Sequence, residues 1–129
     1  LNEKSDPSNA YEPIDSSAAC IAAQGFIRIG NWLKSSDHAR SEKYIQAGIQ
    51  LANNLFSEPY LSTDPEHQGL ILHSIYHQPN GWDYRPDPSK APYGESCMWG
   101  DYHARELALL LQRMQKGETY YSFYNCVSQ

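Results

Sequence analysis

The segment at residues 16–33 restricts the fold of this chain more than any other, because as a helix it would be apolar on nearly all sides. Asp15 precedes it and can accept hydrogen bonds from the free amides of the first turn. Two apolar stripes follow at helical spacing: Ala18, Ile21, Ala22, Gly25, Ile29 and Trp32 in the first, and Ala19, Ala23, Phe26, Gly30 and Leu33 in the second. Such a helix is buried on more than one side, either as a general core helix or as the inner helix of a two-layer helical assembly.

Two further helices are predicted. One covers about residues 37–56, and its apolar residues lie on one face: Tyr44, Ile45, Gly48, Ile49, Ala52, Leu55 and Phe56. One-sided burial of this kind is typical of an outer helix. The other begins near Gly100 and Asp101, and Gly117 is placed to end it. Its apolar stripe consists of Leu107, Leu110, Leu111 and Met114.

The long connection at residues 57–99 has no helical period. Residues 70–77 alternate as in a strand, Asn80-Gly81 is a tight-turn signal, and residues 82–84 can return as a second strand, so the sequence predicts a short β-hairpin. Aromatic side chains are frequent here: Tyr76, Trp82, Tyr84, Tyr93, Trp99 and Tyr102. Such rings either bind the apolar face of a sugar or fasten the loop onto the helices.

Charge and composition argue against several classes of function. The net charge of −5 opposes binding to nucleic acid, and no apolar stretch approaches the about 18 residues of a membrane span, so neither partner is expected. Cys20, Cys97 and Cys126 form no CxxC pair, which argues against a disulfide framework or a zinc module. Reduced thiols favour a cytoplasmic location.

Few residues form a pattern for catalysis or metal binding. His73 and His77 are four residues apart, but no third ligand is evident, so no metal site is assigned. Glu95 and Asp101 flank Trp99-Gly100 and could mimic the carboxylate pair of a glycosidase. Asp101 equally fits the first turn of a helix, where a carboxylate stabilises the helix dipole.

Three short stretches together resemble the C-terminal part of the unsaturated glucuronyl hydrolase family, glycoside hydrolase family 88. The stretches are DSSAACIAA at residues 15–23, SIYH at residues 74–77 followed by NG at residues 80–81, and WGDY at residues 99–102 running into ELALL at residues 106–110. Each stretch alone is moderately specific. Their common order and spacing make the resemblance strong.

The resemblance implies an all-α fold, an (α/α)6 toroid, of which this chain holds a C-terminal fragment of about three helices. We therefore expect a polar lead-in over residues 1–14, a partial toroid domain over residues 15–117 and a tail over residues 118–129. Because the toroid of the family has twelve helices and this chain holds about three at its C-terminal end, the rest of the toroid is expected upstream of Leu1. That missing N-terminal part, or a second copy of this chain, is then an expected partner.

The resemblance also implies an activity. Enzymes of this family hydrate the 4,5-double bond of the unsaturated uronic acid that ends a lyase-generated oligosaccharide. The two family aspartates that act in this reaction lie in the N-terminal half of the domain, so no catalytic residue is assigned here, and no cofactor is implied. The alternative is a truncated, inactive sugar-binding or protein-interaction module.

Three substrate-binding positions follow from the resemblance. Tyr76 and His77 match an aromatic–His pair of the family, and Asn80 falls where some relatives place a lysine that meets a sulfate. Ile75 and Gln78 fall where those relatives place serines, so the pattern that favours sulfated sugars is lost. We expect Tyr76 and His77 to face a ligand cleft, which requires a bend after Ile75 because a strand would place them on opposite faces.

Overall fold

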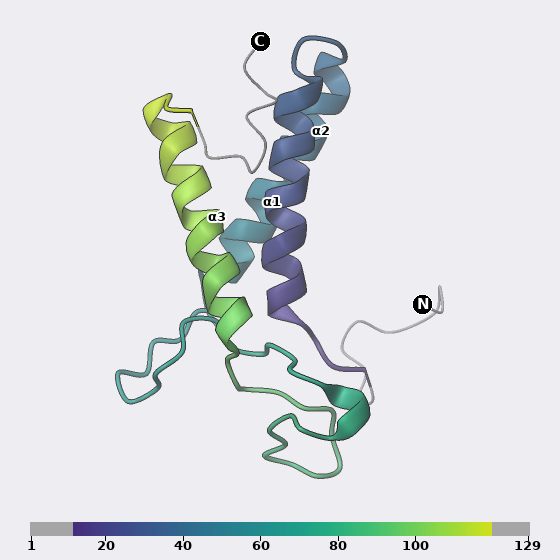
Figure 1. Cartoon of the computed structure of the whole chain (residues 1–129), viewed down its shortest axis with the longest axis vertical. Helices are drawn as coiled ribbons and strands as arrows, with labels where there is room; N and C mark the ends of the chain where they lie inside the picture. The colour runs from purple at the N-terminus through teal and green to yellow at the C-terminus, as the bar shows by residue number, and fades with distance from the viewer. Residues whose placement is uncertain (1–11, 120–129) are drawn as a thin grey trace.

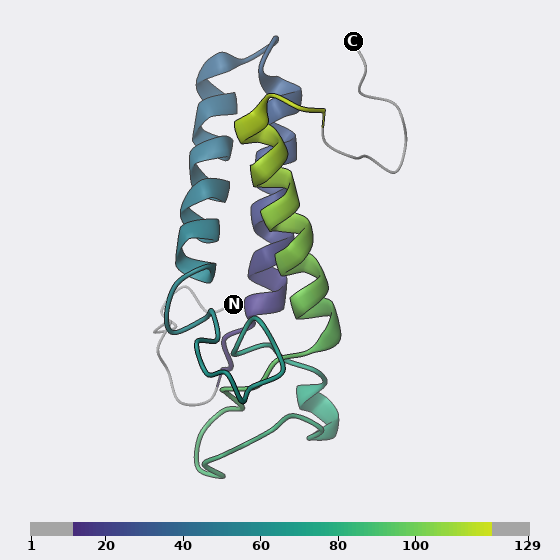
Figure 2. The ribbon, with the colours of Figure 1, turned by 90° about the vertical axis from the view of Figure 1, so that its left-hand side faces the viewer.

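The computed structural model describes residues 12–119, which form three long helices. These helices are α1 (Ser16–Leu33), α2 (His38–Leu55) and α3 (Met98–Lys116), and the connection between α2 and α3 contains the short 3-10 helix η1 (Gln78–Asn80). α1 and α3 run in the same direction and α2 runs opposite to them (Figure 1). The connection gathers at one end of the three helices, as the turned view also shows (Figure 2).

Most of the expected lead-in and tail, together with Cys126, lies outside the described residues. None of the helices between residues 12 and 119 is both long and apolar enough to cross a membrane.

The helix ends follow local capping rules. The Asp15 carboxylate accepts hydrogen bonds from the Ser17 and Ala18 amides, and the Asp37 carboxylate accepts one from the Arg40 amide. Helix α3 begins at Met98, earlier than expected, because the Cys97 sulfur accepts a hydrogen bond from the Gly100 amide at 3.4 Å. A thiol is a weak acceptor and therefore a weak signal in the sequence. Gly117 ends α3 at a φ of 68°, as predicted.

Helices α1 and α2 approach each other closely at two glycines. A Cβ atom on Gly48 would lie 2.8 Å from the Ala23 carbonyl oxygen, and one on Gly30 would lie 2.9 Å from the Ser41 carbonyl oxygen. The Ser41 hydroxyl also donates a hydrogen bond of 2.7 Å to the Gly30 carbonyl oxygen. The two predicted helices thus form an αα-hairpin, and their backbones are in contact.

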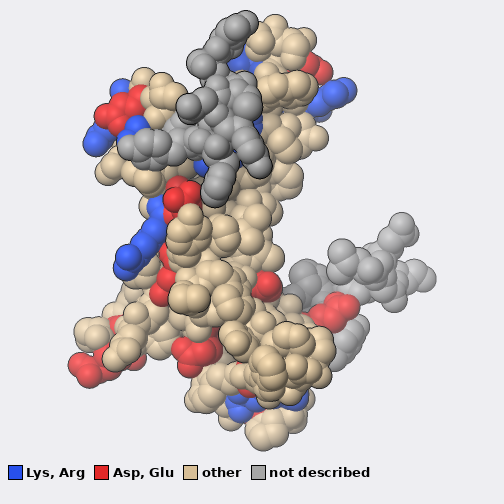
Figure 3. All heavy atoms as spheres, viewed as in Figure 1, with Lys and Arg blue, Asp and Glu red and all other residues tan. Residues whose placement is uncertain are grey.

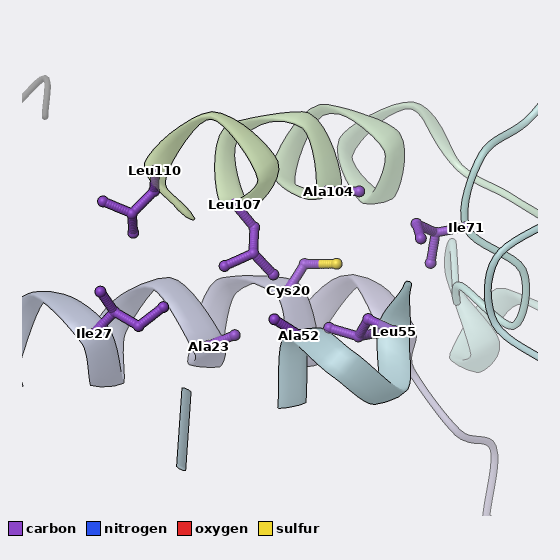
Figure 4. Packing of buried hydrophobic residues seen from close by; sticks show 9 residues of the cluster. All are labelled: Cys20, Ala23, Ile27, Ala52, Leu55, Ile71, Ala104, Leu107 and Leu110. Carbon is purple, nitrogen blue, oxygen red and sulfur yellow. The ribbon is translucent and has the colours of Figure 1, made fainter. Parts of the chain in front are cut away.

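The buried core lies between the three helices and the connection. Its residues are Cys20, Ala23, Ile27, Ala52, Leu55, Ile71, Ala104, Leu107 and Leu110. Leu107 and Leu110 of α3 point toward α1 (Figure 4). Beside them, the Gln24 amide group donates a hydrogen bond of 3.1 Å to the His103 carbonyl oxygen and so joins α1 to α3.

The buried face of α1 contains part of the second predicted stripe, namely Ala23, Gly30 and Leu33. It also includes Cys20, Gln24 and Ile27, which belong to neither stripe. The first stripe faces outward in the described chain: Ile21 and Ile29 are exposed, and Trp32 is 68% exposed. The surface over the lower part of α1 is correspondingly almost free of charge (Figure 3). This chain therefore covers only one side of a helix that is apolar on two.

The predicted β-hairpin at residues 70–84 is wrong. Within residues 12–119 the structure has no β-sheet, only an isolated antiparallel bridge between Leu61 and Ile71. His73 adopts a φ of 64°, which interrupts the extended run. The turn at Asn80-Gly81 belongs to η1 instead, with Gly81 at a φ of 67°. Residues 70–77 alternate in sequence as the residues of a strand do. Their backbone amides, however, donate hydrogen bonds to groups other than a returning strand.

Candidate functional site

Three aspartate side chains from different places in the sequence hold the connection at residues 70–77. Asp101, in the first turn of α3, accepts hydrogen bonds from the Leu70 and Ile71 amides at 2.9 and 3.0 Å. The Asp15 carboxylate, besides capping α1, accepts one from the Ile75 amide at 3.4 Å. Asp83 accepts hydrogen bonds from the Tyr76 and His77 amides. The Leu72 and Ser74 amides donate to the backbone carbonyls of Tyr60 and Glu95. Carboxylates and these two carbonyls thus accept the hydrogen bonds that a second strand would accept in a hairpin.

Aromatic rings cluster where this connection bends at Tyr76. The Tyr76 ring stacks on the Trp99 ring, with centroids 5.1 Å apart and planes 25° apart. The Trp82 ring lies 5.8 Å from the Tyr76 ring and 5.2 Å from the His77 ring. We call Tyr76, His77, Trp82 and Trp99 the aromatic platform. It is open to solvent, since Tyr76 is 53% and Trp82 62% exposed.

The platform includes two of the three predicted substrate-binding residues, and the third lies next to it. Asn80 is exposed at the end of η1, and its amide N–H donates a hydrogen bond of 3.3 Å to Nδ1 of His77. In the neutral imidazole, Nδ1 therefore has no proton, and Nε2 carries it. His77 then offers an N–H donor at the surface, which suits a sugar hydroxyl or a uronate oxygen.

His73 and His77 do not act together. His73 is half-buried, its Nδ1 accepts a hydrogen bond from the Gly94 amide, and its ring meets the Tyr60 ring edge-on with centroids 5.7 Å apart. His77 belongs to the aromatic platform. No group of three His, Cys, Asp or Glu side chains in the described part of the chain is arranged to hold a metal ion.

Glu95 and Asp101 each have a structural partner. The Glu95 carboxylate lies 3.1 Å from Nε2 of His67, and Asp101 is occupied by the two backbone amides described above. A hydrogen bond to the Gly69 backbone, and then the Glu95 side chain, raises the pKa of His67 above its ordinary value. The contact fastens the loop at residues 67–69 to the segment before α3.

The two described cysteines are poor nucleophiles. Burial, and then the nearby Asp101 and Asp15 charges, raise the pKa of the Cys20 thiol to about 11. Burial also raises the pKa of the Cys97 thiol. Both thiols are free, and both are protonated near neutral pH.

Sequence reasoning missed Asp83, which fixes the backbone of the predicted pair. The available signal was an Asp shortly after a turn, because Asp side chains commonly accept hydrogen bonds from nearby backbone amides. The sequence pattern did not indicate from which amides the Asp83 carboxylate would accept hydrogen bonds. Of the other aromatic residues singled out in the connection, Tyr84 and Tyr102 are exposed, and neither ring pairs with a platform ring within the described residues.

No protein-family model matches the sequence, and no curated protein matches it. Two chains of known structure are similar, each with a TM-score of 0.66 and 28% sequence identity over 98% of this chain. One is the unsaturated glucuronyl hydrolase of Bacillus sp. GL1, described as responsible for the degradation of glycosaminoglycan. The other is described as a UGL variant with dGlcA-Glc-Rha-Glc.

This chain matches a fragment of the helical toroid of unsaturated glucuronyl hydrolase. The three-helix, all-α prediction is confirmed, apart from the hairpin. The chain spans 29% of the length of each matched structure, which is consistent with the predicted C-terminal portion of unsaturated glucuronyl hydrolase.

Proposed function

We propose that this chain is the part of a glycoside hydrolase that binds an unsaturated uronic-acid oligosaccharide through its aromatic platform. The observation that carries the proposal is the similarity over 98% of the chain to unsaturated glucuronyl hydrolase. The exposed rings of Tyr76 and Trp82 support it, because an aromatic ring packs well against the apolar face of a pyranose.

The proposed reaction adds water across the 4,5-double bond of the terminal unsaturated uronic acid. The hydroxyl adds to C5 and the proton to C4, and the resulting hemiketal opens and releases the neighbouring sugar. The acid and base of this step lie outside the residues that this chain contributes. The chain's own residues orient the sugar: Tyr76 covers its apolar face, and His77 donates a hydrogen bond from Nε2.

A second candidate function is a catalytically inactive module for sugar or protein binding. The exposed stripe of α1 favours association with another polypeptide, because Ile21, Ile29 and Trp32 form an apolar surface that gains stability when covered. The rest of a toroid, or a second copy of this chain, would supply that cover.

The first test measures turnover and binding by this chain alone. We expect no hydration of an unsaturated glucuronyl disaccharide, followed by the ultraviolet absorbance of its C4–C5 double bond, but saturable binding in isothermal titration calorimetry. Turnover that disappears in Asp101→Asn or Glu95→Gln would contradict the proposal and identify an acid within this chain. Absence of binding would contradict the sugar-binding role of the platform.

The second test uses the chain together with the remaining part of the toroid. Tyr76→Ala and His77→Ala are expected to raise KM more than they lower kcat. The reason is that both side chains would bind the sugar about equally in the ground state and in the transition state. Tyr84→Ala is the matched control, because Tyr84 is 57% exposed and lies outside the platform. Unchanged kinetics in both platform variants would show that the rings only pack the loop.

A further inference from the structure

We propose that Trp82-Asp83 organises the sugar-binding platform, with Asp83 as its positioning residue and Trp82 as a third sugar-contacting side chain. The proposal rests on the proposed function for the identity of the ligand. It assigns roles to two residues that the family resemblance does not include among the substrate-binding positions.

The backbone geometry creates the need for a positioning group. Side chains of consecutive residues in an extended chain point to opposite faces. Here the rings of Tyr76 and His77 both lie within 6 Å of the Trp82 ring, at 5.8 and 5.2 Å between centroids, so the two rings share one side. The bend at Tyr76 that allows this leaves two adjacent amides without a strand partner.

Asp83 meets both amides with one carboxylate. Its Oδ1 accepts a hydrogen bond from the Tyr76 amide, and its Oδ2 accepts one from the His77 amide at 3.0 Å. Hydrogen bonds to an ionised acceptor are shorter and stronger than neutral ones. The bidentate contact fixes the orientation of both residues at once.

Trp82 is placed by the same contact. It precedes Asp83 directly, so the carboxylate that holds the Tyr76 and His77 amides also brings the indole against their rings. The indole remains 62% exposed after these contacts, which leaves most of its surface for a ligand. The Tyr76 ring also stacks on the Trp99 ring, and this contact restricts the orientation of Tyr76.

The platform is therefore formed before a ligand arrives. A preformed site loses less conformational freedom on binding, and its affinity rises accordingly. Since the amides of Tyr76 and His77 are at the solvent-exposed end of the molecule, water can replace the carboxylate when it is removed. Loss of Asp83 should thus disorder the platform and leave the three-helix core intact.

The experiment compares Asp83→Ala with Asp87→Asn in the full chain. Asp87 is the matched control, because its carboxylate lies in the same connection and accepts hydrogen bonds from the amide and hydroxyl of Ser89. Two readouts are measured: hydrogen exchange of the Tyr76 and His77 amides by NMR, and the dissociation constant for an unsaturated glucuronyl disaccharide by calorimetry. Trp82→Ala is measured by calorimetry alone.

We expect Asp83→Ala to speed exchange of the two amides and to weaken disaccharide binding, each by about tenfold, which is the loss of about one charge-assisted hydrogen bond. Trp82→Ala should weaken binding by a similar factor, and Asp87→Asn should change neither readout. Unchanged exchange in Asp83→Ala would overturn the positioning role, whether or not the sugar binds.

Two other outcomes are also decisive. Faster exchange with an unchanged dissociation constant would show that Asp83 holds the backbone but does not serve the ligand, which overturns the proposal. A wild-type chain that binds no disaccharide would contradict the proposed function and the role of Trp82, while the exchange readout would still decide whether Asp83 positions the pair.

Discussion

Replacing Gly48 by Ala is expected to destabilise the chain, although alanine is the better helix former. Gly48 lies within α2, where Ala is favoured over Gly by about 1 kcal/mol on intrinsic propensity. Opposing this gain, the new Cβ would lie 2.7 Å from Cγ1 of Ile27, 2.8 Å from the Ala23 carbonyl oxygen and 3.2 Å from the Ile27 amide nitrogen.

Two of these three contacts are with the backbone of α1, so they cannot be relieved by a change of rotamer. Ile27 is itself fully buried in the core, which restricts its side chain as well. The helices must therefore move apart, and overpacking of this kind typically costs about 1–3 kcal/mol. We expect the cost to exceed the propensity gain, with a net loss of up to about 2 kcal/mol in the free energy of unfolding.

The assay is urea unfolding followed by far-ultraviolet circular dichroism, with Gly25→Ala as the matched control. Gly25 lies in α1, and a Cβ added there would meet no atom of another segment within 4 Å, so the same substitution at this position should stabilise the chain by about 0.5–1 kcal/mol. If Gly48→Ala were as stabilising as Gly25→Ala, the close approach of α1 and α2 would be refuted.

Two further predictions concern the connection. Asp101→Ala should lower the free energy of unfolding by about 1–3 kcal/mol and speed exchange of the Leu70 and Ile71 amides, because both amides lose the carboxylate that accepts their hydrogen bonds; unchanged exchange would contradict this. His67 should titrate above 6.5 by NMR, and Glu95→Gln should lower its pKa. Because folding raises the pKa of His67, its protonated form stabilises the folded chain. This contribution to stability is complete below pH 6.5 and is lost as pH rises through the folded pKa. A measured His67 pKa at or below 6.5 would contradict the predicted upward shift.

The helices were predictable because their signals are local. Asp15 and Asp37 cap the helices that follow them, Gly117 ends α3, and the one-sided apolar face of α2 contains the buried Gly48 and Ala52. These features depend on neighbours within a few residues, and the sequence displays them directly.

The candidate site was predictable in part. The family resemblance assigned Tyr76, His77 and Asn80, and the structure brings them together next to Trp82. Asp83 could not be assigned from the pattern, because its role depends on a bend in the backbone six to seven residues away. A carboxylate in the sequence does not indicate which amides it will accept from.

The sequence by itself determined the three helices, the Asp15 cap, the end of α3 at Gly117 and the apolar character of α1 on two sides. Tertiary structure decided which side of α1 is buried here, because that depends on where the other two helices approach it. Helix α2 approaches α1 at Gly30. Helix α3 packs on the side that contains Cys20, Gln24 and Ile27. It also decided that residues 70–77 form no hairpin. Backbone amides bond to whichever acceptors lie within reach in space, and here these are the carboxylates of Asp15, Asp83 and Asp101 and the backbone carbonyls of Tyr60 and Glu95.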